Sequence, residues 1–263
     1  MGVLNVTPDS FSDGGRYLDP LRALEHALEM EEAGADVIDL GGESTRPAGA
    51  RTVSAEVELE RVGPVLQKLG ARLRVPISID TRKAAVARAA LDHGAAMIND
   101  ISALTADPNM AALAAHAGCP VVLMHMRGSI ENHIRSARYR DVVKEVREYL
   151  RARVRFALAS GIASSRIIVD PGLGFAKLAV HNLALLRGLP SLCALGYPVL
   201  IGASRKTFIR GIAGDSRESV TFASATVDAF AVASGAAMVR VHDVAASKAA
   251  IRIATAYAGH SMR

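Results

Sequence analysis

The run AMVRVHD at residues 237–243 decides the predicted fold, because it is the eighth short apolar run of its kind in the chain. The seven earlier runs, at residues 2–6, 35–40, 75–80, 96–100, 120–126, 166–170 and 198–202, read GVLNV, ADVIDL, VPISID, AMIND, PVVLMHM, RIIVD and PVLIG. They are rich in β-branched and aliphatic residues and lack strict alternation with polar ones, which is typical of strands buried on both faces of a parallel sheet. The sequence therefore predicts eight buried strands.

Helical patterns lie between these runs. In residues 139–161, for example, apolar positions recur every three or four residues among Lys, Glu and Arg, namely Val143, Val146, Leu150, Val154 and Ala157. Strict alternation of strand and helix favours an α/β fold with a parallel sheet. Eight such units in 263 residues, with no compositional break, predict one (β/α)8 TIM barrel domain over residues 1–263. A doubly wound sheet is the alternative.

Composition limits the functions to be considered. The net charge of +5 suits an anionic partner, but aromatic residues make up only 4% and Trp is absent, so stacking platforms for nucleic acid are scarce. No stretch reaches the roughly 18 apolar residues of a membrane span, and the N-terminal residues match no targeting pattern. Two distant cysteines, Cys119 and Cys193, are typical of a reducing compartment. We expect a cytoplasmic protein that binds a small anionic molecule, no nucleic acid and no membrane.

Polar residues follow the predicted strands, where barrel enzymes place their chemistry. In chain order they are Asn5, Glu43, Ser44, Thr45, Arg46, Asp80, Asn99, His125, Arg127, Asp170, Ser204, Arg205, Lys206, Arg240 and His242. Taken singly, Asp80 or Thr81 could cap the following helix, Asn99 and Asp170 could form turns, and Ser204 could be an N-cap. Taken together, they predict one polar mouth at the carboxyl end of a barrel.

Two segments indicate that this mouth binds an anion. Arg240 and His242 stand two residues apart, so they share one face of the last strand, where a buried Arg needs an anion such as a phosphate. A salt bridge to Asp243 or to another acid is the alternative. In the segment IGASRKTFIRGI, the hydroxyls of Ser204 and Thr207 stand near a predicted helix start, beside the cationic Lys206.

Eight motifs occur in one order along nearly the whole chain: MGVLNVTPDSFSDGG, GGESTRP, SIDT, NDIS, LMH, DPGLGF, GASRK and RVHDV. With them the sequence resembles the dihydropteroate synthase family. The resemblance implies a (β/α)8 barrel that works as a homodimer. Its expected reaction joins 6-hydroxymethyl-7,8-dihydropterin diphosphate to p-aminobenzoate, giving 7,8-dihydropteroate and diphosphate.

The resemblance also implies roles for individual residues of this chain. The expected pterin contacts are Asp80, Asn99, Met124, Asp170, Phe175 and Lys206. The expected diphosphate contacts are Asn5, Arg240 and His242, with Asn5 also holding a Mg2+ ion. The expected p-aminobenzoate contacts are Pro8, Phe11, Thr45, Arg46, Ser204 and Thr207. Catalytic roles are implied for Lys206, Arg240, His242, Phe11 and Asp13, the last two on a first loop that closes over the mouth.

The expected chemistry of such a site is an SN1-like displacement, because an electron-rich pterin stabilises a methylene cation once diphosphate leaves. Charge on the leaving group is then the main barrier, which Mg2+ and fixed donors lower. The arylamine is neutral at pH 7 and needs no strong base. Two other functions stay open at this point: a pterin-dependent methyltransferase that acts with a corrinoid protein, and a non-catalytic pterin or phosphate binder.

Overall fold

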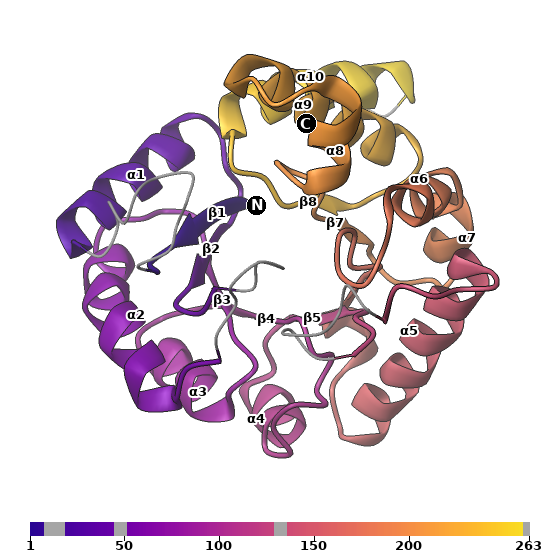
Figure 1. The fold of residues 1–263 in the computed structure, drawn as a ribbon. Helices are drawn as coiled ribbons and strands as arrows, with labels where there is room; N and C mark the ends of the chain where they lie inside the picture. Colours follow the sequence, from indigo (N-terminus) through magenta and orange to yellow (C-terminus); the bar gives the residue numbers. More distant parts are fainter. Residues whose placement is uncertain (8–18, 45–51, 129–135, 260–263) are drawn as a thin grey trace.

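The computed structural model describes residues 1–7, 19–44, 52–128 and 136–259, and it contains all eight predicted strands (Figure 1). The strands are β1 (Gly2–Asn5), β2 (Ile38–Gly41), β3 (Ile77–Asp80), β4 (Met97–Asp100), β5 (Val121–Met124), β6 (Ile167–Asp170), β7 (Leu200–Ile201) and β8 (Met238–Val239). Each lies within its predicted run, except that β2 extends one residue further, to Gly41, so the apolar runs located every strand.

The strands close into a barrel. A parallel ladder joins β1 to β6 in chain order, and a second ladder pairs β7 with β8. Two single bridges complete the ring, Val169 with Val199 between β6 and β7, and Gly2 with Val241 at the junction of β1 and the residues after β8. The predicted (β/α)8 barrel is confirmed, and the doubly wound alternative is excluded.

Helices form the outer ring in Figure 1. They are α1 (Pro20–Glu32), α2 (Ala55–Gly70), α3 (Ala84–Asp92), α4 (Met110–Ala117), α5 (Val142–Ala159), the 3-10 turn η3 (Ser164–Arg166), α6 (Ala179–Arg187), α7 (Leu189–Cys193), α8 (Thr207–Ala213), α9 (Arg217–Ala233) and α10 (Val244–Tyr257). Helix α5 occupies the predicted segment, and its buried stripe repeats every three or four residues: Val142, Val146, Leu150, Val154 and Ala157. Of the predicted apolar positions there, only Val143 is half-buried.

Side-chain caps fix where several of these helices begin. Asp19, Ser54, Asp141, Ser216 and Asp243 each accept a hydrogen bond from a backbone amide in the first turn of the helix that follows. Such caps satisfy amides that have no partner inside the helix, and each stabilises its helix by about 1 kcal/mol. Asp243 therefore caps α10, a helix on the outside of the barrel.

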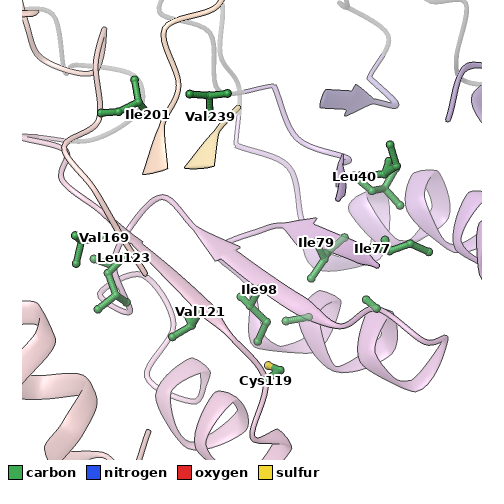
Figure 2. Close-up of a cluster of buried hydrophobic side chains, with 14 of the residues drawn as sticks. Leu40, Ile77, Ile79, Ile98, Cys119, Val121, Leu123, Val169, Ile201 and Val239 are labelled. Carbon is green, nitrogen blue, oxygen red and sulfur yellow. The ribbon is translucent and has the colours of Figure 1, made fainter. Parts of the chain in front are cut away.

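The two faces of the strands carry different cores. Side chains on the outer face, which include Leu40, Ile79, Ile98, Leu123 and Val239, pack in one cluster with the helices (Figure 2). Positions of the opposite parity point into the barrel, and there a smaller apolar cluster fills the interior: Met1, Val37, Met97, Val122, Ile168, Leu200 and Met238. Burial on both faces explains why the strands lack an alternating pattern.

Among the described residues, no helix is both long enough and apolar enough to cross a membrane. Cys119 and Cys193 are both free thiols.

Candidate active site

A cavity opens where the strands end. Its lining residues are Asp80, Asn99, Ile101, Met124, Asp170, Phe175, Gly202, Ser204, Lys206, Arg240 and His242. All but Ile101 and Gly202 were expected at a substrate site, and they come from the strand ends that the sequence marked as polar. The structure therefore brings these predicted residues together around one concave site, the kind of place where small ligands bind.

One layer of the barrel interior is polar, and three of its four residues line the cavity. It comprises Asp39 of β2, Asn99 of β4, Asp170 of β6 and Arg240, which follows β8. Alternate strands of such barrels supply layers of four side chains, and bulky apolar residues usually fill them. Here Asp39 Oδ2 accepts hydrogen bonds from Arg240 Nε at 2.6 Å and Asn99 Nδ2 at 3.0 Å. Part of the layer is thus a hydrogen-bonded network.

Arg240 forms ion pairs with two carboxylates of the barrel interior. Besides Asp39, it donates from Nη2 to Asp80 Oδ2 at 2.8 Å. A salt bridge to another acid, the alternative stated for Arg240, is therefore present, but not with Asp243, which caps α10 instead. Burial raises the pKa of Asp80 to about 7, and the positive charge of Arg240 opposes that rise.

Asp170 begins a tight loop that carries part of the cavity wall. Its Oδ1 accepts a hydrogen bond from the amide of Gly172 at 2.6 Å, so the alternative role of a turn former is real and coexists with its place on the cavity. Burial raises the pKa of Asp170, against the attraction of Lys206. Gly172 has a φ of 66°, and a Cβ there would overlap the carbonyl oxygen of His125, so only glycine fits this turn.

Lys206 reaches the same cavity from the residue before α8. Its ammonium donates to the carbonyl oxygen of Leu173 and lies 4.7 Å from the centroid of the Phe175 ring. Burial lowers the pKa of Lys206 to about 8, and Asp170 opposes the fall. A Cβ on Gly174 would lie 2.8 Å from Lys206 Cδ, so the absence of a side chain at Gly174 leaves room for the side chain of Lys206.

Part of the cavity wall is apolar. Met124 and Phe175 pack in one cluster with Ile101 and Met126. Three of these four line the cavity, where they face carboxylates, an amide and two cations. The cavity thus combines an apolar wall with polar and charged side chains.

Ser204 and Thr207 have different surroundings. The Ser204 hydroxyl accepts from the His242 amide at 3.2 Å and lies 3.1 Å from His242 Nδ1, so it supports the histidine. The alternative role of Ser204 as an N-cap is wrong, because Lys206 precedes the first residue of α8. Thr207 is that first residue; it is exposed and does not line the cavity.

An amide oxygen and a carboxylate oxygen lie beside Gly41. A Cβ on Gly41 would lie 3.3 Å from Asn5 Oδ1 and 3.8 Å from Asp80 Oδ2, so the missing side chain leaves a space bounded by an amide oxygen and a carboxylate oxygen. Mg2+ prefers such oxygens and completes its shell with water and phosphate. No group of three or more His, Cys, Asp or Glu residues suited to a metal occurs within the described ranges. The donors therefore fit a Mg2+ shared with a phosphate ligand.

Other predicted polar residues do not line this cavity. Glu43 forms ion pairs with Arg82 and Lys83, and Arg127 with Glu145. Five further predicted residues lie outside the described residues: Pro8, Phe11, Asp13, Thr45 and Arg46.

Two supporting residues were missed by sequence reasoning. Asp39 lies inside a predicted strand and not at its end, and its one signal was an acid in the apolar run VIDL. Lys177 is buried and donates to the carbonyls of Gly172 at 3.0 Å and Phe175 at 2.8 Å and to His125 Nδ1 at 2.9 Å. Burial lowers the pKa of His125 to about 2, so a neutral imidazole receives this bond. No sequence pattern marked Lys177.

Comparison with known proteins identifies the family. The profile of the family described as "Pterin binding enzyme" matches residues 1–242. The dihydropteroate synthase of Mycobacterium leprae is 51% identical over 98% of this chain and 92% of its own length. The chain belongs to the dihydropteroate synthase family. The Synechocystis dihydropteroate synthase is 48% identical, over 97% of this chain and 89% of its own.

Solved structures of dihydropteroate synthases share the fold. That of Yersinia pestis, in a sulfonamide drug complex, superposes with a TM-score of 0.94 at 41% identity, covering 98% of this chain and 94% of its own. That of Xanthomonas albilineans, with 4-aminobenzoic acid, has a TM-score of 0.90 at 45% identity, covering 98% and 92%. The resemblance seen in the sequence motifs is confirmed, and the chain is a transferase of this family.

Proposed function

We propose that the cavity binds 6-hydroxymethyl-7,8-dihydropterin diphosphate and p-aminobenzoate and joins them into 7,8-dihydropteroate. The observation that carries this proposal is the cavity with an apolar wall to which the polar layer presents carboxylates, an amide and a cation. An amino-pyrimidine edge is rich in N–H donors, which carboxylates accept. A diphosphate is an anion, which cationic side chains bind.

The pterin is proposed to lie deepest. Asp170 presents a buried carboxylate that can accept two parallel N–H bonds, and such charge-assisted pairs are roughly twice as strong as neutral ones. Asn99 and Asp80 border the same space, and Met124 and Phe175 supply its apolar walls. Lys206 adds a donor for a ring oxygen or nitrogen.

The diphosphate is proposed to lie between Arg240, His242 and Asn5. Arg240 Nη1 is the guanidinium nitrogen that neither Asp39 nor Asp80 engages. A Mg2+ held by Asn5, with Asp80 Oδ2 bordering the same space, would neutralise charge that develops on the leaving group. These residues hold the leaving oxygens before the bond breaks, so little reorganisation remains for the transition state.

The p-aminobenzoate is proposed to bind nearer the opening, beside Lys206, Ser204 and Thr207. Pro8, Phe11, Thr45 and Arg46 complete this proposed subsite, and Asp13 and Phe11 are proposed to act in catalysis on the first loop. In support, the Xanthomonas albilineans relative is a complex with 4-aminobenzoic acid.

The reaction needs charge stabilisation more than proton abstraction. The bond from the pterin methylene carbon to the diphosphate oxygen breaks, and its electron pair leaves on that oxygen. The neutral amine nitrogen then supplies the pair for the new C–N bond and releases a proton. Arg240 and His242 hold the departing anion, while the walls of the cavity keep water from the cation.

Turnover of purified protein tests this proposal. With Mg2+, the dihydropterin diphosphate and labelled p-aminobenzoate, we expect labelled dihydropteroate and one diphosphate for each bond formed, with chelator abolishing both. Methyl transfer to a corrinoid protein would instead favour the methyltransferase, and pterin binding without product would favour the non-catalytic binder. Either result from folded protein would overturn the proposed reaction.

We propose further that the enzyme works as a homodimer in the cytoplasm. Phe222 and Phe230 of α9 are 62% and 66% exposed, and Ile253 and Tyr257 of α10 are 73% and 87% exposed. These helices adjoin in Figure 1, and an apolar surface of this kind marks an interface. Light scattering is expected to show a dimer that Phe230→Glu dissociates; a monomeric wild-type protein would contradict this.

A further inference from the structure

Asp39 is the member of the polar layer that does not line the cavity. Asp39 is 0% exposed. One of its carboxylate oxygens, Oδ2, accepts hydrogen bonds from both Arg240 Nε and Asn99 Nδ2. The other oxygen, Oδ1, is buried and has no hydrogen-bond partner among the described residues. Burying an acceptor in this way is costly, so a purely structural layer would be served better by an apolar side chain.

The first consequence concerns the amide of Asn99. An ionised carboxylate only accepts hydrogen bonds, whereas an amide has one donor end and one acceptor end. The donor end of Asn99 must therefore face Asp39, which turns its Oδ1 away from that carboxylate. Since Asn99 lines the cavity, the bond to Asp39 leaves Asn99 Oδ1, an acceptor, to face a ligand in place of the NH2 group.

The second consequence concerns the guanidinium of Arg240. Asp39 holds Nε and Asp80 holds Nη2, from strands on the same side of the barrel. Two fixed partners determine the plane of the guanidinium group and the direction of Nη1. The bond to Asp39 spans 201 residues of sequence and crosses the seam at which the barrel closes.

We propose that Asp39 is a positioning residue that sets ligand selectivity, because it orients the amide of Asn99 and the guanidinium of Arg240 from beneath the cavity. It touches neither substrate. This inference rests on the pterin site proposed above, and it adds the reason why the site presents acceptors to one half of the substrate and a cation to the other.

The test compares Asp39→Asn with the matched control Asp36→Asn. Asparagine has the shape of aspartate, but its own amide lets Asn99 turn over and present a donor. Asp36 precedes β2 and forms a surface pair with Lys248 at 3.0 Å, so the control removes a carboxylate from the same segment without touching the layer. Affinity is measured by titration calorimetry with 6-hydroxymethylpterin and with its analogue that carries a 2-oxo group in place of the 2-amino group.

Wild type and Asp36→Asn are expected to prefer the 2-amino ligand to the same degree. Asp39→Asn is expected to lose roughly 10-fold or more of that preference, the size of one hydrogen bond to a charged group. In the double variant with Asn99→Ala, the loss is expected to be no larger than with Asn99→Ala alone, because Asp39 acts through Asn99.

Equal weakening of both ligands, an unchanged preference, or additive losses in the double variant would each overturn the role of Asp39. A wild-type protein that binds neither pteridine would overturn the proposed site itself. If Asp39→Asn does not fold, the wild-type enzyme still decides: by NMR of 15N-asparagine-labelled protein, the side-chain amide of Asn99, assigned by its absence in Asn99→Ala, must exchange slowly with D2O. Fast exchange would overturn the proposal.

Discussion

Two layers of the barrel interior lie only two residues apart on the same four strands, and they differ completely in character. The lower layer is apolar: Val37, Met97, Ile168 and Met238. The upper layer is polar: Asp39, Asn99, Asp170 and Arg240. Side chains two apart share a face of a strand, so both layers point inward. The comparison shows an apolar and a polar layer separated by a single repeat of the strand. We predict that the lower layer serves packing, that the upper layer serves ligand binding, and that each can be changed without the other.

The largest effect is expected from Arg240→Met, which removes the cation of the upper layer. Asp39 and Asp80 would then be buried without their partner, and breaking such a buried pair costs about 3–5 kcal/mol of unfolding free energy. Turnover is expected to fall at least about 100-fold, as on losing a fixed donor to a developing anion. Urea unfolding and steady-state assays measure both, with the exposed Arg252→Met as control.

The stability loss of Arg240→Met is also expected to depend on pH. The pKa of Asp80 in the folded protein is already raised to about 7, above its unfolded value, and removing Arg240 raises it further. A raised carboxyl pKa favours the folded state when the group is protonated, so the variant recovers stability as the pH falls from 8 to 6. A loss that does not change over this range would contradict the assigned ion pair.

The lower layer is expected to respond in stability alone. Ile168→Ala leaves a cavity in the apolar cluster and is expected to cost about 2–5 kcal/mol of unfolding free energy. Turnover per folded molecule should stay within about 3-fold of wild type, because the cavity-lining side chains are unchanged. A KM for the pterin substrate that rises more than 10-fold with little loss of stability would show that the two layers are not separable.

A smaller effect is expected from the titration of Lys206. Its pKa is lowered to about 8, so its ammonium is charged below that pH and neutral above it. If the charge binds the pterin, kcat/KM for that substrate should fall about 10-fold between pH 7 and pH 9. In Lys206→Arg the guanidinium stays charged, and the fall should move to higher pH. An unmoved profile in that variant would assign the titration to another group.

Most of the fold could be predicted from the sequence, because each strand is a local apolar run and each helix a local 3.6-residue pattern. Both β8 and α5 fall where their patterns put them. The alternative role of Ser204 as an N-cap was wrong. Its hydroxyl is instead hydrogen-bonded to His242, which lies 38 residues away and comes close only when the barrel closes.

The candidate site was predictable where it sits at strand ends, and less so below them. Asp170, Lys206 and Arg240 stood out as polar residues after apolar runs. Asp39 and Lys177 did not, since their importance depends on buried contacts with residues from distant parts of the sequence. The partner of Arg240 was likewise left open, because a sequence does not show which of several acids a buried arginine meets.

Titration of 6-hydroxymethylpterin into two matched variants tests the division between the layers most directly. Asp170→Asn changes one charge in the upper layer, and Ile168→Val removes one methyl group from the same strand in the lower layer. We expect Ile168→Val to bind the pterin within about 3-fold of wild type and Asp170→Asn to lose at least about 100-fold, the size of a charge-assisted bidentate contact. Wild-type affinity in Asp170→Asn, with correctly folded protein, would contradict the assignment of the polar layer to ligand binding.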